Sequence, residues 1–519
     1  MSRPNCPKCG KQMTRGQKAQ SGKLRWECKT VHSYCYSTTN PEKTIVTNRS
    51  GRKAKTPIFK RTLGGATRFV VTAAQNGTPV HAGFLGSLEA YCQANSAELI
   101  VVPLRYKNPT SRWTASQAND EVWAPEVQPY LCNQRKRLAK GLLLMGDIKT
   151  QPTAVSPLNG FEAISHSESA IFAHTKLQLR TVPAPSSRLP KIMTTTGACT
   201  RANYTDSKAG KLGEFHHTLG ATLVEVKGKR FHMRQLNGAK DDGSFQDLTT
   251  YYGMDGTKDA PVAALIMGDT HVDCIDPKVM RATFGVQGML DQLKPGVLVW
   301  HDLLDGEAVN PHHEGNPFIA VSKRASNTDI AEDEVRRALT FMLKHTPKET
   351  LSVLVPSNHD DFLRRWLVRA NWKEQPVNAR FYLQTALAMV EQAERGAEAE
   401  KLSPFAYLAK QFFYGHDNMK VLGNDESYCV AGVELGMHGD RGPNGARGSR
   451  LNLRRIGIKS VIGHSHSPGI EEGCYQVGTS TRLRLSYNSG PSSWLNTHCA
   501  VYSTGKRSLI NIVDGEWRA

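Results

Sequence analysis

The chain contains no stretch of eighteen consecutive apolar residues, although 39% of its 519 residues are hydrophobic. A helix needs about twenty apolar residues to span a bilayer, so the sequence predicts a soluble protein without a membrane-spanning helix. The first ten residues, MSRPNCPKCG, are polar and contain cysteine, which does not fit a secretory signal. We therefore expect a cytoplasmic location.

Acidic residues are scarce at the N-terminus. The whole chain has 66 Lys and Arg against 47 Asp and Glu, a net charge of +19. Residues 1–60 hold fourteen of the basic residues but only Glu27 and Glu42, so this arm alone carries +12. Such a charge favours a polyanionic partner, most simply nucleic acid. A solvated basic tail is the alternative that charge leaves open.

Cysteine is concentrated in the same arm, where four of the eleven precede residue 36. Cys6 and Cys9 have C-x2-C spacing, whereas Cys28 and Cys35 are further apart, so His32 is an alternative ligand. Four thiolates match tetrahedral zinc, and a short segment with few apolar residues needs such a staple. We expect a structural Zn²⁺ in a zinc ribbon over residues 1–40, with a disulfide or free thiols as alternatives. The segment resembles the DNA-binding zinc ribbons of transposases and other nucleic-acid enzymes.

Residues 41–60 mix turn-forming and basic residues and are interpreted as a basic linker. The following segment, TRFVVTAAQNGTPVHAGFLGSLEAYCQANSAELIVVPLRY, reads as strand, helix, strand, which predicts a βαβ unit with a parallel sheet. GLLLMGD and SESAIFAHTKLQLRTVP could repeat that unit. We assign residues 61–255 to an α/β domain for which the sequence indicates no function.

Five apolar runs in the second half each stop at a small or polar residue and are followed by metal-ligand side chains. They are APVAALIMGDTHVD, with Asp269 and His271; GVLVWHDLLDG, with Asp302; TLSVLVPSNHDDF, with Asn358, His359 and Asp360; VAGVELGMHGDRG, with His438; and IKSVIGHSHSPG, with His464 and His466. Strands of a buried sheet can project short loops from one edge, so we expect these side chains to converge.

Soft thiolate ligands are absent from these five segments, which instead combine carboxylates with imidazoles. Such donors suit divalent manganese, iron or zinc. With one aspartate shared, the seven proposed ligands can hold two ions roughly 3.5 to 4 Å apart, the spacing used for displacement at phosphorus.

The order D-x-H, D, N-H-D, H, G-H-x-H resembles that of the calcineurin-like metallophosphoesterase superfamily over residues 260–500. The resemblance implies an α/β fold, a four-layer β-sandwich with flanking helices, over a catalytic domain of residues 256–519. It also implies two divalent ions, with Mn²⁺ favoured and Fe, Zn or Mg as options. By this resemblance, one ion is held by Asp269, His271, Asp302 and His466, and the other by Asp302, Asn358, His438 and His464.

The same resemblance assigns catalytic roles to His359 and Asp360. A hydroxide held by the ions would attack phosphorus, His359 would protonate the leaving oxygen, and Asp360 would orient His359. The chain departs from the family pattern at HDLLDG, where His301 and Gly306 replace the usual glycine and basic residue. GHDN at 415–418 is an alternative to the element that contains Asn358.

Basic residues near the proposed ligands are candidates for substrate binding. Arg441 and Arg447 lie in HGDRGPNGARGSRLNLRR, directly after His438, and arginine matches phosphate geometry. His313 lies in PHHEGNPF and would line a substrate groove. A solvated loop is the alternative for the arginines, and an ordinary surface or core histidine is the alternative for His313.

The sequence leaves three functions in competition. The favoured one is a metal-dependent DNA nuclease, similar to the repair-exonuclease branch and to nuclease-like proteins of tailed phages, because the ribbon and the basic arm favour long polyanions. The second is a protein phosphatase or small-nucleotide phosphodiesterase whose ribbon binds a partner. The third is a non-enzymatic DNA-binding or assembly protein with a vestigial site. Self-association, strand preference and endo or exo cleavage are left open.

Replacing Cys6 and Cys9 by serine tests the role of the N-terminal arm. If the ribbon binds DNA, the double variant will bind DNA more weakly and still hydrolyse a small chromogenic phosphodiester at the wild-type rate. Both quantities are measured on the same preparation. An equal loss of small-diester hydrolysis would mean that the ribbon supports the catalytic domain structurally.

Overall fold

A computed structural model describes residues 11–15, 25–27, 35–37, 58–59, 63–105, 122–398 and 401–518. The chain divides into two compact units, Met1–Pro57 and Ile58–Ala519. In the first unit, β1 (Thr14–Arg15), β2 (Arg25–Glu27) and β3 (Cys35–Ser37) form an antiparallel sheet. The predicted zinc ligands Cys6, Cys9 and Cys28 lie outside the described residues, as does the side chain of Cys35 and most of the predicted linker.

The predicted βαβ unit is confirmed at the start of the second unit. Strands β4 (Arg68–Gln75) and β5 (Glu98–Leu104) pair in parallel and are joined by α1 (Ala82–Ala94). His81 caps the N-terminus of this helix, and its Nδ1 accepts a hydrogen bond from the backbone N–H of Phe84. Strands β11 (Gly220–Lys227) and β12 (Arg230–Asn237) extend this sheet in the order β12-β11-β4-β5.

A six-stranded sheet carries the first proposed ligands. Its strands β16 (Val262–Ile266), β17 (Val297–Trp300), β18 (Leu351–Leu354) and β19 (Met419–Val421) are parallel, and β25 (Thr497–Tyr502) and β26 (Arg507–Asn511) continue it antiparallel. The parallel strands are largely buried, which explains their continuous apolar sequences. Their carboxyl ends lie at one edge of the sheet.

A ten-stranded sheet joins two distant parts of the chain. Its order is β20-β21-β22-β24-β23-β9-β10-β8-β7-β6. The early strands are β6 (Arg135–Ala139), β7 (Leu142–Met145), β8 (Ser169–Phe172), β9 (Gln178–Val182) and β10 (Lys191–Thr195). The late strands are β20 (Cys429–Val430), β21 (Val433–Glu434), β22 (Lys459–Ile462), β23 (Gly469–Glu471) and β24 (Cys474–Gln476).

This sheet corrects the predicted domain boundary at residue 255. Strand β9 pairs with β23, with Leu179 opposite Ile470, so the early and late strands share one hydrogen-bonded ladder. The backbone N–H of Leu509 also donates to the side-chain oxygen of Gln235 at 3.1 Å, which links β26 to β12. The suggested repeat of the βαβ unit is also wrong, because β7 and β8 are parallel but residues 146–168 between them form turns and no helix.

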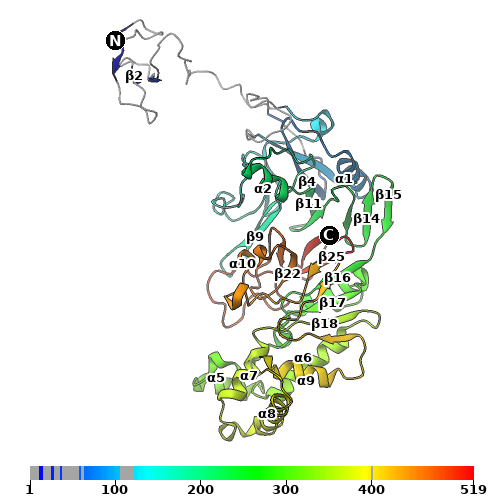
Figure 1. The fold of residues 1–519 in the computed structure, drawn as a ribbon. Helices are drawn as coiled ribbons and strands as arrows, with labels where there is room; N and C mark the ends of the chain where they lie inside the picture. The colour runs from blue at the N-terminus through cyan, green and yellow to red at the C-terminus, as the bar shows by residue number, and fades with distance from the viewer. Residues whose placement is uncertain are drawn as a thin grey trace. The chain divides into compact units, whose positions relative to one another are not determined.

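The six-stranded sheet packs against the ten-stranded sheet on one face and against helices on the other. One core cluster combines side chains of the six-stranded sheet, such as Val299, with side chains of the ten-stranded sheet, such as Val461. A second cluster packs the other face of the six-stranded sheet, including Trp300, against helices. Burying each large apolar side chain stabilises the fold by roughly 1.5 to 3 kcal/mol. The fold is therefore mixed α/β, with several sheets and covering helices (Figure 1).

The helices near the six-stranded sheet include α3 (Pro277–Phe284), α4 (Met289–Leu293), α6 (Ala331–His345), α7 (Asp360–Arg369) and α9 (Pro404–Phe412). Figure 1 shows α5 (Pro317–Ala325) and α8 (Ala379–Glu394) grouped with α6, α7 and α9. Helix α10 (Arg450–Leu453) packs on β22 and β24. The other elements are α2 (Lys208–His216) and the antiparallel strands β13 (Phe245–Asp247), β14 (Thr250–Gly253) and β15 (Gly256–Asp259). No helix in the described ranges has both the length and the apolar character to cross a membrane.

A buried ion network fixes the four-stranded sheet to β13. The Arg234 side chain is only 3% exposed and lies 2.7 Å from Glu225 and 2.8 Å from Asp247. Burying an ion pair costs desolvation energy, but removing one partner costs more because it strands the other charges. The Arg234 guanidinium therefore balances the charges of Glu225 and Asp247, which are too buried for water to solvate fully.

Arg234→Met should lower the stability of the second unit by about 3 kcal/mol, because it removes the cation between Asp247 and Glu225 and leaves Glu225 with only the longer 3.5 Å pair to Arg68. The midpoint of urea denaturation measures this loss. The matched control is Arg324→Met, which removes an exposed arginine 3.2 Å from Asp329 and should shift the midpoint little. Equal shifts for both variants would contradict a special role for the buried network.

Candidate metal centre

The structure brings together all seven side chains that the sequence predicted as metal ligands. Asp269 and His271 follow β16, Asp302 follows β17 and Asn358 follows β18. His438 follows β21, and His464 and His466 follow β22. Because β16, β17 and β18 are parallel to one another, and β21 and β22 likewise, the ligand loops emerge from carboxyl ends of strands in both sheets.

The first donor group surrounds His466. Its Nε2 lies 3.1 Å from His271 Nε2 and 3.2 Å from Asp269 Oδ2. His271 Nε2 is also 3.5 Å from Asp302 Oδ2. All four side chains are buried. These residues are the ones predicted for the first ion.

The second donor group contains the same aspartate. His438 Nε2 lies 3.1 Å from Asp302 Oδ2 and 3.2 Å from the side-chain oxygen of Asn358. His464 Nδ1 lies 2.9 Å from that oxygen. One oxygen of Asp302 therefore stands between the two donor groups, as a bridging ligand would.

The donors fit divalent ions in spacing and in chemistry. Ligands about 2.1 Å from an ion in octahedral geometry are about 3.0 Å from one another, close to the observed separations. Asp269 Oδ1 and Asp302 Oδ1 are buried and make no hydrogen bond within the described part of the chain. Buried carboxylate oxygens without partners are costly unless a cation is bound. The buried groups could therefore hold metal ions.

Charge coupling in the centre also favours cations. Burial raises the pKa of Asp302, but the charges of His438 and His359 outweigh it and hold that pKa well below its usual range. Burial lowers the pKa of His438, but the Asp302 carboxylate outweighs it and raises the net value. Without metal, His438 and His271 thus keep protons beside the carboxylates, because the pKa values of both imidazoles are raised. A bound cation would replace those protons, because imidazole ligates only when neutral.

Four proposed ligands have left-handed backbone conformations. The φ angles are 39° for His271, 45° for Asp302, 75° for His464 and 57° for His466. Each costs roughly 1 kcal/mol or more for a residue with a Cβ atom. Strain concentrated at these positions indicates that the loops are held for a function rather than for stability.

Gly463 is required by the close approach of the two sheets. A Cβ atom on Gly463 would lie 2.1 Å from Asp269 Oδ1 and 3.2 Å from the Cβ of His301. Any side chain there would push Asp269 out of the first donor group. The glycine of the GHSH segment thus makes room for a ligand delivered by the other sheet.

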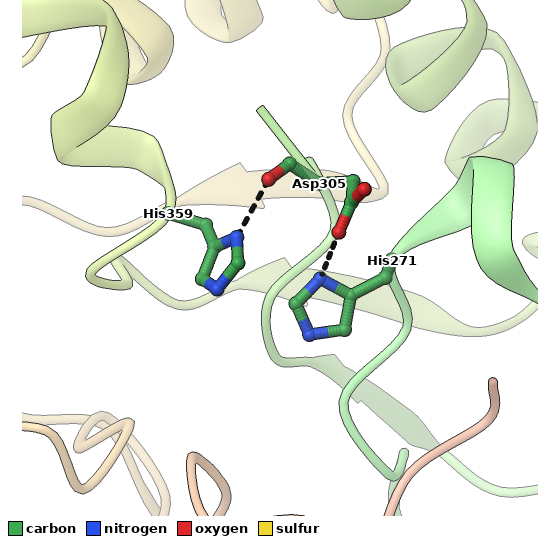
Figure 2. A group of neighbouring side chains, drawn as sticks. All are labelled: His271, Asp305 and His359. Carbon is green, nitrogen blue, oxygen red and sulfur yellow. Dashed lines mark hydrogen bonds and ion pairs between the residues drawn. The ribbon is translucent and has the colours of Figure 1, made fainter. Parts of the chain in front are cut away.

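Asp305 orients two imidazoles at once and was not identified from the sequence. Its backbone carbonyl accepts a 2.6 Å hydrogen bond from His359 Nδ1, and its carboxylate Oδ1 lies 3.0 Å from His271 Nδ1 (Figure 2). Figure 2 shows the two Nε2 atoms on the side away from Asp305. Asp305 is visible in the HDLLDG segment, three residues after Asp302, but its spacing alone did not show which side chains it would contact.

The predicted role of Asp360 needs correction. His359 Nδ1 is oriented by the Asp305 carbonyl, whereas Asp360 Oδ2 accepts a 3.0 Å hydrogen bond from the backbone N–H of Ser357. Asp360 begins α7, and its carboxylate turns back toward the loop that presents Asn358. Burial and the charge of Asp302 together raise its pKa to about 8. Asp360 therefore shapes the Asn358 loop.

The predicted substrate contacts differ in exposure. Arg441 and Arg447 are exposed and form an isolated antiparallel bridge, and Arg441 lines a cavity of about 340 Å³ together with His438. Arg450 is bonded to the Ser467 carbonyl and to Gln476, so it supports the loop. His313 lies 3.3 Å from Glu307, in the wall of a separate cavity of about 900 Å³.

Two alternatives raised by the sequence are decided by position. His416, in the GHDN segment, is exposed between α9 and β19, whereas Asn358 lies in the second donor group. His498 is buried and structural: its Nδ1 accepts from the backbone N–H of Gly268, and burial lowers its pKa to about 3. His301 is likewise buried, and its pKa is lowered to about 4 by burial and by the charge of His438.

Comparison with known proteins places the chain in a family of phage proteins. It is 32% identical over 467 residues to Protein A1 of Escherichia phage T5, and the alignment covers 87% of this chain and 83% of that protein. The chain therefore belongs to the same family as Protein A1, which supports the predicted phage origin. No known protein-family profile and no solved structure matches the sequence.

Replacing His464 by glycine or by alanine separates strain from metal binding. Both variants lose the ligand, but at φ 75° glycine avoids the Cβ penalty that alanine retains. In chelator, His464→Gly should therefore be more stable than His464→Ala by about 1 kcal/mol. Thermal unfolding of both variants measures the difference. Alanine equal to or better than glycine would contradict strain at this loop.

Proposed function

We propose that the protein is a metal-dependent phosphodiesterase that hydrolyses DNA. The observation that carries the proposal is the position of Asp302 Oδ2, 3.5 Å from His271 Nε2 and 3.1 Å from His438 Nε2. A carboxylate between two imidazole-containing donor groups is the arrangement expected of a dinuclear centre. The packed sheets, with ligand loops at strand ends, support assignment to the calcineurin-like metallophosphoesterase superfamily, and the basic N-terminal arm favours its repair-exonuclease-like branch.

Two divalent ions, most simply manganese, would neutralise charge on the phosphate and activate water when bound. Iron, zinc and magnesium are the alternative ions for the same donors. Asp269, His271 and His466 would hold one ion and Asn358, His438 and His464 the other, with Asp302 shared. The structural zinc of the N-terminal arm is a separate expectation.

His359 is suited to proton transfer at the leaving oxygen. A carbonyl oxygen can only accept, so the hydrogen bond to Asp305 places a proton on His359 Nδ1 and leaves Nε2 to exchange protons with substrate. Burial lowers the pKa of His359, and the charge of Asp302 raises it in part. A phosphate beside Nε2 would stabilise the protonated ring, which could then donate to the departing 3′ or 5′ oxygen.

DNA is favoured over other phosphodiesters by charge. The chain carries +19, its first sixty residues carry +12, and the exposed Arg441 and Arg447 follow His438. Neutralising many phosphates releases counterions and drives binding of long polyanions. These features have no equivalent purpose for a small phosphodiester.

The test is incubation of the purified protein with manganese and labelled linear or circular DNA, beside a small chromogenic phosphodiester. Asp302→Ala should abolish DNA cleavage and lower the manganese content, because one carboxylate serves both donor groups. His416→Ala, which removes an exposed histidine outside the centre, should leave both quantities unchanged.

Other outcomes would redirect the assignment. Hydrolysis of the small diester without DNA cleavage would indicate a protein phosphatase or nucleotide phosphodiesterase. Unchanged manganese content in Asp302→Ala would contradict the shared carboxylate. A protein that binds no metal would indicate a DNA-binding or assembly role. Loss of DNA binding with rising salt, without a matching loss of small-diester turnover, would support the polyanion argument.

A further inference from the structure

The loop formed by residues 482–496 is fixed against the metal centre. Near its start, the backbone N–H of Arg482 donates to the carbonyl of Cys274, three residues after His271. Near its end, the backbone N–H of Leu495 donates to the carbonyl of His466. Between these points, Ser492 and Ala184 exchange two backbone hydrogen bonds of 3.0 Å. Both ends of the loop are therefore anchored beside metal ligands.

Two aromatic side chains of this loop extend outward from His466. The Trp494 ring lies edge-on to His466, with centroids 4.2 Å apart and planes at 67°. The Tyr487 ring follows Trp494, with centroids 5.8 Å apart and planes at 61°. Trp494 is half-buried, and Tyr487 is 53% exposed. The three rings thus run from a metal ligand to the surface.

Tyr487 lies at the outer end of a series of ring contacts that starts at His466. Burial of the hydroxyl raises its pKa, and the carboxylates of Asp305, Asp302 and Asp269 raise it further. The tyrosine therefore stays neutral, and its side chain is partly exposed to solvent. An exposed aromatic surface beside a site for phosphate chemistry is placed to contact whatever is attached to that phosphate.

We propose that Tyr487, supported by Trp494, is a stacking platform for the nucleobase next to the scissile phosphate. The inference rests on the proposed DNA hydrolysis and specifies its substrate: a strand whose base is free to leave its neighbours. Every base has a π face, so such a platform tolerates any sequence. In a duplex the bases stack on one another, so the platform favours single strands or frayed ends over intact double helix.

Binding of fluorescently labelled oligonucleotides tests the inference without requiring cleavage. A single strand, its duplex and a strand of the same length with abasic positions are titrated with the full-length protein in chelator. Wild-type protein should bind the base-bearing strand more tightly than the abasic strand. Tyr487→Leu should weaken binding of the base-bearing strand roughly 5- to 150-fold and leave the abasic strand unaffected. Tyr487→Phe keeps the ring and should bind as wild type does.

Tyr414→Leu is the matched control, because Tyr414 is 89% exposed and is not a neighbour of the centre in sequence or in any ring contact of the described chain. It should change no affinity. The inference is overturned if wild-type protein binds both strands equally, or if Tyr487→Leu weakens both equally. The wild-type comparison stands even if Tyr487→Leu does not fold. Absence of DNA cleavage with manganese would reject the proposed function separately, because the cleavage assay is independent of the comparison between base-bearing and abasic strands.

Discussion

The centre depends on the contacts of the Asp302 carboxylate with the imidazoles of His271 and His438. Asp302 is buried at the end of β17 with positive φ, and its Oδ2 lies within 3.5 Å of imidazoles delivered by β16 and β21. A buried carboxylate beside these imidazoles needs its charge balanced, either by a proton on an imidazole or by a bound cation. The two sheets are therefore held in register at their ligand edges by charge as well as by the apolar core between them.

Much of the centre could be predicted because each proposed ligand belongs to a short local sequence pattern. Each ligand follows a short apolar strand, and the end of a buried parallel strand is where a side chain can reach a shared edge. This reasoning located the residues of both donor groups, including Asp302 and Asn358, and the βαβ unit at β4 and β5. Hydrophobic periodicity and the positions of turn-forming residues also indicated a mixed α/β fold.

What was missed depends on contacts that no local pattern encodes. Asp305 acts through its carbonyl as well as its side chain, and a carbonyl has no signature in sequence. Tyr487 and Trp494 reach the centre through a loop anchored on Ala184, about 300 positions earlier in the chain. The boundary after residue 255 failed for the same reason, since composition does not reveal that β9 pairs with β23.

The pairing of β9 with β23 has a consequence for how the centre is assembled during synthesis. His464 and His466 lie between β22 and β23, so the loop that carries them is completed by an edge contributed by the first half of the chain. Contacts of such high sequence separation form late and make folding slow. A fragment released before the last fifth is translated would lack His464 and His466, and residues 256–519 expressed alone would expose the unpaired edge of β23. Assembly of the candidate metal centre thus requires strands from both halves of the chain.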